Sequence, residues 1–469
     1  MRTCLFLLAL AACTDGTDDT EPDTSVDSDS SEETSVYEFD ARDGSGSSVV
    51  YTGQVFRHLL IVGMTQEVGD LTGRIDRGDV FPETGDVTRD MNFYLEFDGS
   101  TGGVVPVPFS ADLPPLQATY ADVASGSSLV EKIAGNDAPG QHADWTTEFV
   151  GWSQPGVTTP ESLVRAWVSE LDSLAVARAG GDIPQWSDGT PMPSVFLTED
   201  GVDLQQLLQK FLLGSIAYSQ GADDYLDDDL DGKGLLSDNT ALVDGQPYTA
   251  LEHAWDEGFG YFGATRTYGS LSDDDIADIG SRDDNEDGAI DLTSERVYGH
   301  ASNAAKRDLG AVVATDYTEQ AWRAFLGGRT LIDSVEGELT ADQLAELRTY
   351  RDDAVDAWER AIAATVVHYI NDVLQDMGKM DGDDYSAASH AKHWAELKGF
   401  SLSLQFNPRS AVSTEDFAAL QERIAMAPVL TSADVDQASL DLIAARDILA
   451  TSYGFAAENL GDSSGENGW

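Results

Sequence analysis

The chain has 469 residues, with 27 Lys and Arg against 84 Asp and Glu, which gives a formal net charge of −57 at pH 7. Its hydrophobic residues make up 41% of the total, enough for a core, so the composition excludes a wholly disordered chain. A charge this negative repels phosphate backbones, and we therefore expect no nucleic-acid partner. The same charge suits cation binding or solubility at high salt.

The first residues predict an exported lipoprotein. Residues 4–12 are apolar but too few to span a bilayer, and they end in Leu10-Ala11-Ala12 directly before Cys13. This string is typical of a bacterial signal peptide that is cut before a cysteine, which is then lipidated. We expect residues 1–12 to be the signal peptide and the lipid on Cys13 to hold the protein on the membrane. An ordinary secretory signal with a chance cysteine is the alternative.

Residues 14–38 are rich in Asp, Glu, Ser and Thr and contain no Lys or Arg. Such a run repels itself and cannot bury apolar surface, so residues 13–46 are predicted to be the lipidated cysteine and a disordered acidic linker. Thr14, and not an acid, follows Cys13, which favours an outer-membrane lipoprotein of the bacterial cell envelope, on its periplasmic or surface face. Because Cys4 leaves with the signal peptide, we expect no thiolate metal site or cysteine nucleophile.

Apolar residues recur at helical spacing from about Ser47, which predicts an all-α protein: a large antiparallel helical bundle over residues 47–460. Residues 73–125, rich in Gly, Pro and Asp, are predicted to be mostly loop, and residues 461–469 to be a disordered tail. Thr340 and Gln343 form a predicted capping box at the start of the longest helix. The predicted helices cover residues 52–60, 159–171, 202–218, 248–262, 301–325, 340–377, 386–406, 413–426 and 433–453.

Two predicted helices share a short signature, in which His, Trp, Glu and Gly-Phe follow in the same order. His253 and Glu257 are four residues apart, and His393 and Glu396 are three apart, so each pair lies on one helical face. A bundle of two pseudo-symmetric halves would bring the two faces together around one transition metal such as iron or zinc. The alternative is that each pair is hydrogen-bonded and holds two helices in register.

An Asp-rich segment carries the spacing of a calcium loop. Asp283, Asn285 and Asp287 occupy its first, third and fifth positions, with Gly288 at the sharp turn. The next ligands would be the Ala289 carbonyl and the Asp291 side chain. Glu295 stands one place after the usual last ligand, where this chain has Ser294. We expect calcium here, in a site looser than an EF-hand or closed by another residue; an acidic turn that binds nothing is the alternative.

A second acidic run repeats the first half of this pattern with Asp227, Asp229 and Asp231. It lacks the apolar residue at the eighth position, where Gly234 stands, so the match to a calcium loop is less complete. Both loops would stabilise the fold and would not catalyse a reaction, because oxygen ligands of this kind saturate the ion.

Several segments, in order along the chain, resemble the bacterial lipoprotein family that carries the domain DUF4856. They are residues 244–263, the Asp-rich loop up to Glu295, residues 303–308 and residues 392–406. This family has no established activity, so the resemblance implies no reaction. A more distant similarity is to imelysin-like proteins, which are helical, exported and linked to iron uptake, and some of which are called metallopeptidases. Their signature is GxHxxE; His393 and Glu396 match it, but Ala391 stands at the glycine position.

The sequence contains no HExxH, GxSxG, Walker or GxGxxG motif, so we predict no catalytic residues. We favour a lipid-anchored, calcium-stabilised protein that is not an enzyme and binds a divalent metal or a metal-bearing ligand, in an imelysin-like way that would suit iron acquisition. Two alternatives stay open. One is a metallopeptidase of the imelysin type, and the other is a calcium-stabilised structural or adhesive surface protein. The sequence identifies no protein partner.

Overall fold

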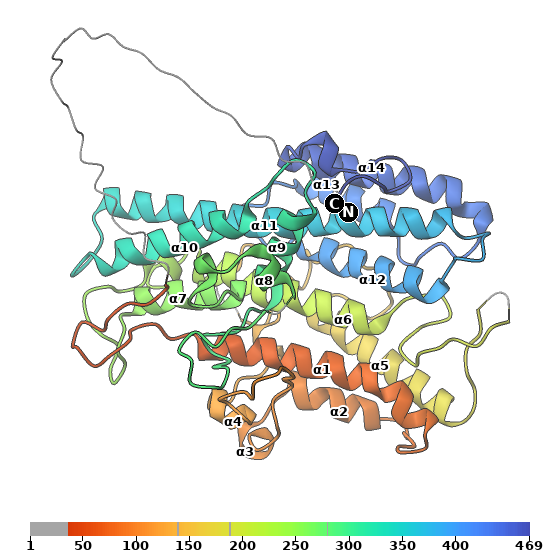
Figure 1. The fold of residues 1–469 in the computed structure, drawn as a ribbon, viewed down its shortest axis with the longest axis horizontal. Helices are drawn as coiled ribbons and strands as arrows, with labels where there is room; N and C mark the ends of the chain where they lie inside the picture. Colours follow the sequence, from red (N-terminus) through yellow and green to blue (C-terminus); the bar gives the residue numbers. More distant parts are fainter. Residues whose placement is uncertain (1–35, 138–139, 187–188, 279) are drawn as a thin grey trace, which may run out of the picture. The chain divides into compact units, whose positions relative to one another are not determined.

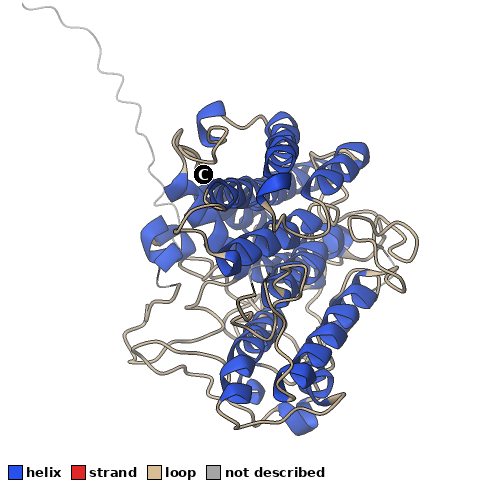
Figure 2. Cartoon of the chain, turned by 90° about the vertical axis from the view of Figure 1, so that its right-hand side faces the viewer, coloured by secondary structure: helices blue, strands red, loops and turns tan. Residues whose placement is uncertain are grey.

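The computed structural model describes residues 36–469 except 138–139, 187–188 and 279. The predicted signal peptide, Cys13 and most of the predicted linker therefore lie outside the described residues. Within the described part the chain is helical, and extended pairing is confined to isolated β-bridges (Figure 2). The predicted all-α helical bundle is confirmed. Among the same residues, no helix combines the length and the apolar character needed to cross a bilayer.

The α-helices of the described residues are labelled in Figure 1 and have these bounds: α1 Thr52–Asp76, α2 Asp86–Leu95, α3 Gly99–Gly102, α4 Tyr120–Val123, α5 Pro160–Ala179, α6 Leu204–Leu212, α7 Ala250–Phe262, α8 Asp273–Asp278, α9 Gly299–Gly310, α10 Tyr317–Asp333, α11 Ala341–Gly378, α12 Ala387–Ser403, α13 Thr414–Ile424 and α14 Val435–Tyr453. The predicted capping box begins α11, since Gln343 N donates to Thr340 Oγ1 at 3.3 Å and Thr340 N donates to Gln343 Oε1 at 2.9 Å.

The longest helix, α11, lies at the centre of the packing and contacts α9, α10, α12 and α14 (Figure 1). Its inward face includes Trp358, Ile362 and Val366, which are completely buried. After α6 the chain continues as π-helical turns over Leu213–Tyr218 and Gly221–Tyr225. Gly221 is needed there because an added Cβ would lie 2.6 Å from the Trp358 ring.

The structure corrects two of the predictions about helices. In both cases the cause is a hydrogen bond between segments that are separated in the sequence. The predicted helix 301–325 is two helices, α9 and α10, because the Asp308 carboxylate accepts the N–H groups of Tyr317 and Thr318, each at 2.9 Å, and so caps α10. Helix α2 lies within residues 73–125, which were predicted to be mostly loop. Its N-terminus is capped by Asp172 of α5, whose carboxylate accepts the N–H of Val87 at 2.9 Å.

The boundaries predicted for the disordered segments are also corrected. Residues 36–46 belong to the folded part, since Tyr37 is completely buried and stacks on Phe259 with 4.0 Å between ring centroids. At the other end, residues 461–469 pack on the bundle, and Trp469 donates from Nε1 to the Arg307 carbonyl oxygen at 3.0 Å. In each segment a buried aromatic ring holds the chain on the bundle, because the ring removes a large apolar surface from water. The composition of the segments alone predicts disorder.

A buried charge network joins the segment before α1 to α7 and α10. Arg329 of α10 is 0% exposed and donates from Nε to Asp256 Oδ1 of α7 at 3.0 Å. The Tyr37 hydroxyl donates to the same oxygen at 2.8 Å. Burial raises the pKa of Asp256 to about 6, against the effects of Arg329 and Tyr37, which lower it. The carboxylate therefore depends on both partners to stay ionised inside the protein.

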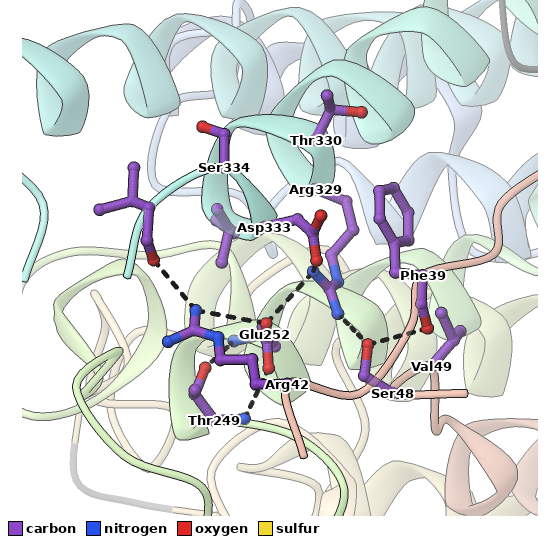
Figure 3. Close-up of polar contacts among 12 residues, drawn as sticks. Phe39, Arg42, Ser48, Val49, Thr249, Glu252, Arg329, Thr330, Asp333 and Ser334 are labelled. Atoms are coloured by element: carbon purple, nitrogen blue, oxygen red, sulfur yellow. Dashed lines mark hydrogen bonds and ion pairs between the residues drawn. The ribbon is translucent and has the colours of Figure 1, made fainter. Parts of the chain in front are cut away.

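The second half of the network centres on Glu252 of α7 (Figure 3). Its Oε1 lies 3.4 Å from Arg42 Nη2 and 3.6 Å from Arg329 Nη1, and its Oε2 accepts the Thr249 N–H at 2.7 Å. Arg329 also donates from Nη2 to Ser48 Oγ at 2.7 Å. Two buried carboxylates are thus matched by two guanidinium groups, and one of these comes from the segment before α1.

Replacing Arg329 by Met tests this network. The variant leaves two buried carboxylates with one cation fewer, and we expect the free energy of unfolding to fall by roughly 3–5 kcal/mol in urea denaturation. The matched control is Arg89→Met, which removes an exposed ion pair with Asp86 and should cost about 1 kcal/mol or less. Equal small losses in the two variants would contradict a stabilising role for the network.

Candidate functional site

The Asp-rich segment folds as a tight loop in which its side-chain oxygens accept successive backbone N–H groups. Asp283 Oδ2 accepts from Gly288 at 2.9 Å, Asn285 Oδ1 accepts from Asp287 at 2.9 Å, and Asp287 Oδ1 accepts from Ala289 at 2.9 Å. Gly288 has φ +86°, the left-handed conformation that the turn requires. Each of these oxygens retains a further lone pair; two of them come from carboxylates and one from an amide, so the loop is not a cluster of three acidic ligands.

Glu295 closes the loop. Its Oε1 accepts the Asp284 N–H at 3.0 Å and its Oε2 accepts the Asp291 N–H at 2.7 Å, so one carboxylate joins both halves of the loop. The side chain is buried, and burial raises the pKa of Glu295. Asp291 Oδ1 accepts from Gln117 Nε2 at 2.8 Å. Glu295 stands one position after the usual last ligand of a calcium loop, and it is the residue that joins the two halves of this loop.

The second acidic run has different partners. Asp227 Oδ1 lies 2.5 Å from Arg409 Nη1, and Asp228 Oδ2 lies 2.6 Å from Arg348 Nε. Burial and the neighbouring Asp227 carboxylate raise the pKa of Asp229. Asp231 is exposed to solvent. Guanidinium groups thus contact the first carboxylates of this run, where calcium was predicted. These ion pairs link the run to neighbouring parts of the chain.

His253 and Glu257 connect α7 to the start of α1. His253 Nδ1 lies 3.0 Å from the Val50 carbonyl oxygen, and the ring stacks on Tyr248 with centroids 4.1 Å apart. Glu257 Oε1 accepts from Gln54 Nε2 at 2.7 Å, and its other oxygen lies 3.7 Å from His253 Nε2.

His393 and Glu396 of α12 face other helices. His393 Nδ1 lies 2.7 Å from Asp376 Oδ2 of α11. Burial opposes protonation of His393, but Asp376 and nearby carboxylates outweigh it and raise its pKa, which is unfavourable for a metal ligand because such a ligand must be unprotonated. Glu396 is buried, and its oxygens lie 3.5 Å from Lys210 Nζ and 3.9 Å from Lys392 Nζ.

The structure does not bring the two His–Glu faces together. Each imidazole already has a close partner on another segment, Val50 in one case and Asp376 in the other. In the part of the chain that is described, no three His, Cys, Asp or Glu side chains form a group that could hold a metal ion. The prediction of one transition metal shared by all four residues is corrected accordingly, and the arrangement agrees with the alternative in which each pair joins two segments.

Sequence reasoning missed the basic side chains of α12 and its neighbours. Lys398 is completely buried and donates to Gln421 Oε1 at 2.9 Å, without an acidic partner among the described residues. Burial lowers the pKa of Lys398 to about 7. Lys398 stands four residues after Trp394 and therefore lies on the same helical face. Because Trp394 is buried, this spacing is the sequence signal that could have predicted the burial of Lys398.

Comparison with models of known protein families identifies a match. A family model described as "Domain of unknown function (DUF4856)" matches residues 161–456, more than half of the chain. No curated protein and no solved structure matches the chain. The similarity to imelysin-like proteins thus gains no support from these comparisons and stays a prediction.

The pH dependence of stability tests the environment of Lys398. Because its folded pKa of about 7 lies below its ordinary 10.5, charged Lys398 destabilises the fold fully below pH 7, and this penalty disappears as the pH rises toward 10.5. We expect Lys398→Met to raise the free energy of unfolding at pH 6 by on the order of 3 kcal/mol, and by less at pH 9. The exposed Lys379→Met is the control and should show no such difference between the two pH values. A gain for Lys398→Met that does not depend on pH would contradict this account.

Proposed function

The chain belongs to the DUF4856 family, and we propose from its own geometry that it is a tethered helical protein of the bacterial cell envelope, stabilised by calcium and without catalytic activity. The calcium site is the loop 283–295. The observation that carries the proposal is the ordered set of oxygens in this loop, from Asp283, Asn285 and Asp287, closed by the buried Glu295.

The position of the loop supports a stabilising role. Ile290 N donates to the Pro114 carbonyl oxygen at 2.9 Å, and Leu116 N donates to the Ile290 carbonyl oxygen at 2.8 Å. On the other side, Arg266 N donates to the Ser294 carbonyl oxygen at 3.0 Å. Two distant segments thus meet at the loop, so an ion bound there would hold both of them and raise the free energy of unfolding.

The electrostatics and the proposed location favour calcium. A chain with a net charge of −57 attracts divalent cations, and oxygen ligands suit calcium better than transition metals. Calcium loops of extracellular proteins work at dissociation constants of about 0.1–1 mM, so even a weak site outside the cytoplasm would be filled. Export and lipidation at Cys13 rest on the sequence around residues 4–13 and stay part of the proposal.

The metallopeptidase alternative has less support. It needs an unprotonated imidazole, a carboxylate base and an open metal position in one place. His393 is bound to Asp376, Glu396 lies between two lysines, and His253 contacts a backbone carbonyl. These side chains act between segments of the protein, and we therefore place no reaction at them.

Calcium removal tests the proposal. We expect 5 mM calcium to raise the melting temperature of the EGTA-treated protein by a few degrees, which corresponds to a stabilisation of about 1–3 kcal/mol. Asp287→Ala should abolish this response because it removes a ligand at the centre of the loop. Differential scanning calorimetry measures both effects.

The matched control is Asp231→Ala, which removes an exposed carboxylate from the second acidic run and should keep the full calcium response. A melting temperature of the unmodified protein that is the same in EGTA and in calcium would refute the proposed site. A response lost equally in both variants would indicate unspecific screening of negative charge instead.

A further inference from the structure

A cavity of about 250 Å³ lies where α11, α12, α13 and α14 meet. Its inner wall consists of apolar side chains that are at most 5% exposed: Val373, Met377, Trp394, Ile424 and Leu442. The other lining residues are Glu422, Arg423, Ala425, Ala427, Val429, Asp434, Gln437, Ala438 and Asp441. Pockets that bind small molecules commonly have this composition, with an apolar interior and a few polar groups that orient the ligand.

The cavity exists because several of the residues that line it are small. Ala425, Ala427 and Ala438 contribute only methyl groups, which leave the space between the helices unfilled. An apolar cavity of about 150 Å³ holds a benzene molecule, so this one has room for a molecule of about ten non-hydrogen atoms. Apolar walls offer water few hydrogen bonds, and an apolar group that displaces this water therefore gains free energy.

The backbone at the end of α13 shapes the wall of the cavity. Ala425 follows the last residue of this helix and has φ +65° and ψ −162°, a conformation that is almost confined to glycine. Trp394 Nε1 donates to the Ile424 carbonyl oxygen at 3.1 Å, so the indole ring is attached to the end of the same helix. Such a backbone conformation costs free energy and is often found where a ligand binds. Here it directs residues 425–429 along the cavity.

The charged residues at the entrance of the cavity have a negative net charge. Glu422 and Asp434 are exposed, and Asp441 is half-buried. Arg423 is the basic residue of this set, and its Nη1 lies 3.4 Å from Asp441 Oδ1, so these two charges offset each other. The carboxylates of Glu422 and Asp434 remain, and they attract a cation and repel an anion at the entrance.

We propose that this cavity binds a small organic cation, a molecule with an apolar body of up to about ten non-hydrogen atoms and one ammonium group. The body would lie against the apolar inner wall, and the ammonium group would lie near Glu422 and Asp434 at the entrance. A carboxylate of the same size would be repelled by these two side chains. The cavity shares no residue with the loop 283–295, so its test does not depend on the proposed calcium site.

The test is isothermal titration calorimetry of the full-length protein with three ligands of similar shape at constant ionic strength. They are 2-phenylethylamine, which carries a positive charge at neutral pH, the uncharged 2-phenylethanol, and the anion phenylacetate. We expect the amine to bind with a dissociation constant of about 1 mM or below, the alcohol to bind about fivefold more weakly, and phenylacetate to bind more weakly still. Failure of the amine to bind overturns the proposal, and so does phenylacetate that binds as tightly as the amine.

Two variants with matched controls test whether the amine binds in the cavity. Ala438→Phe adds a ring at the wall of the cavity and should weaken the binding of 2-phenylethylamine about tenfold or more, whereas Ala345→Phe, at an exposed position near the start of α11, should leave it unchanged. Glu422→Gln should weaken the binding of the amine about threefold and leave that of the alcohol unchanged. Glu415→Gln, at an exposed position of the same helix outside the cavity, should change neither.

Circular dichroism shows whether Ala438→Phe is folded. If it is not, Glu422→Gln decides the question, because substitution of an exposed carboxylate has little effect on folding. Unchanged affinity for the amine in a folded Ala438→Phe variant or in Glu422→Gln overturns the proposal. Equal weakening in Glu415→Gln and Glu422→Gln overturns it too, because that result would show a general attraction of the cation to an acidic chain.

Discussion

The structure depends on the pairing of a few buried guanidinium groups with carboxylates in a chain that has an excess of acid. Arg329 lies between Asp256 and Glu252 inside the bundle, and through Ser48 it attaches the segment before α1. Arg409, which is partly exposed, pairs with the buried Asp227. Because each of these cations is matched by a carboxylate, the pairs cancel, and the large negative net charge of the chain remains on its surface, where water solvates it.

The sequence predicts those helices whose ends are defined by neighbouring residues. The capping box of Thr340 and Gln343 can be read within four positions, and α11 begins there. Helix α2 could not be predicted in this way, because its cap is Asp172, about ninety positions later in the chain. The same reason explains residues 36–46, where Tyr37 is held by residues of α7 that no local composition reveals. Long-range contacts thus set the limit of the prediction.

Long-range contacts limit the prediction of the candidate sites in the same way. Both acidic runs begin with side-chain oxygens at alternate positions, yet Asp227 contacts Arg409, while Asp283 lies in a loop closed by Glu295. Helical spacing placed each His–Glu pair on one face correctly, but spacing says nothing about what the face meets. For His393 that partner is Asp376 of another helix. A spacing pattern predicts which side chains lie on the same face, but it does not predict which groups this face contacts.

The same electrostatic reasoning describes the surroundings of the few basic side chains in this acidic chain. In a chain with this composition, acids lie near almost every position, so an acidic run needs no special cause. Arg307 has no ion pair among the described residues, and burial lowers its pKa, yet Tyr369 and Asp372 of α11, the helix against which α9 packs, act in the opposite direction and raise it. Even this guanidinium group thus stays close to acidic groups of the chain.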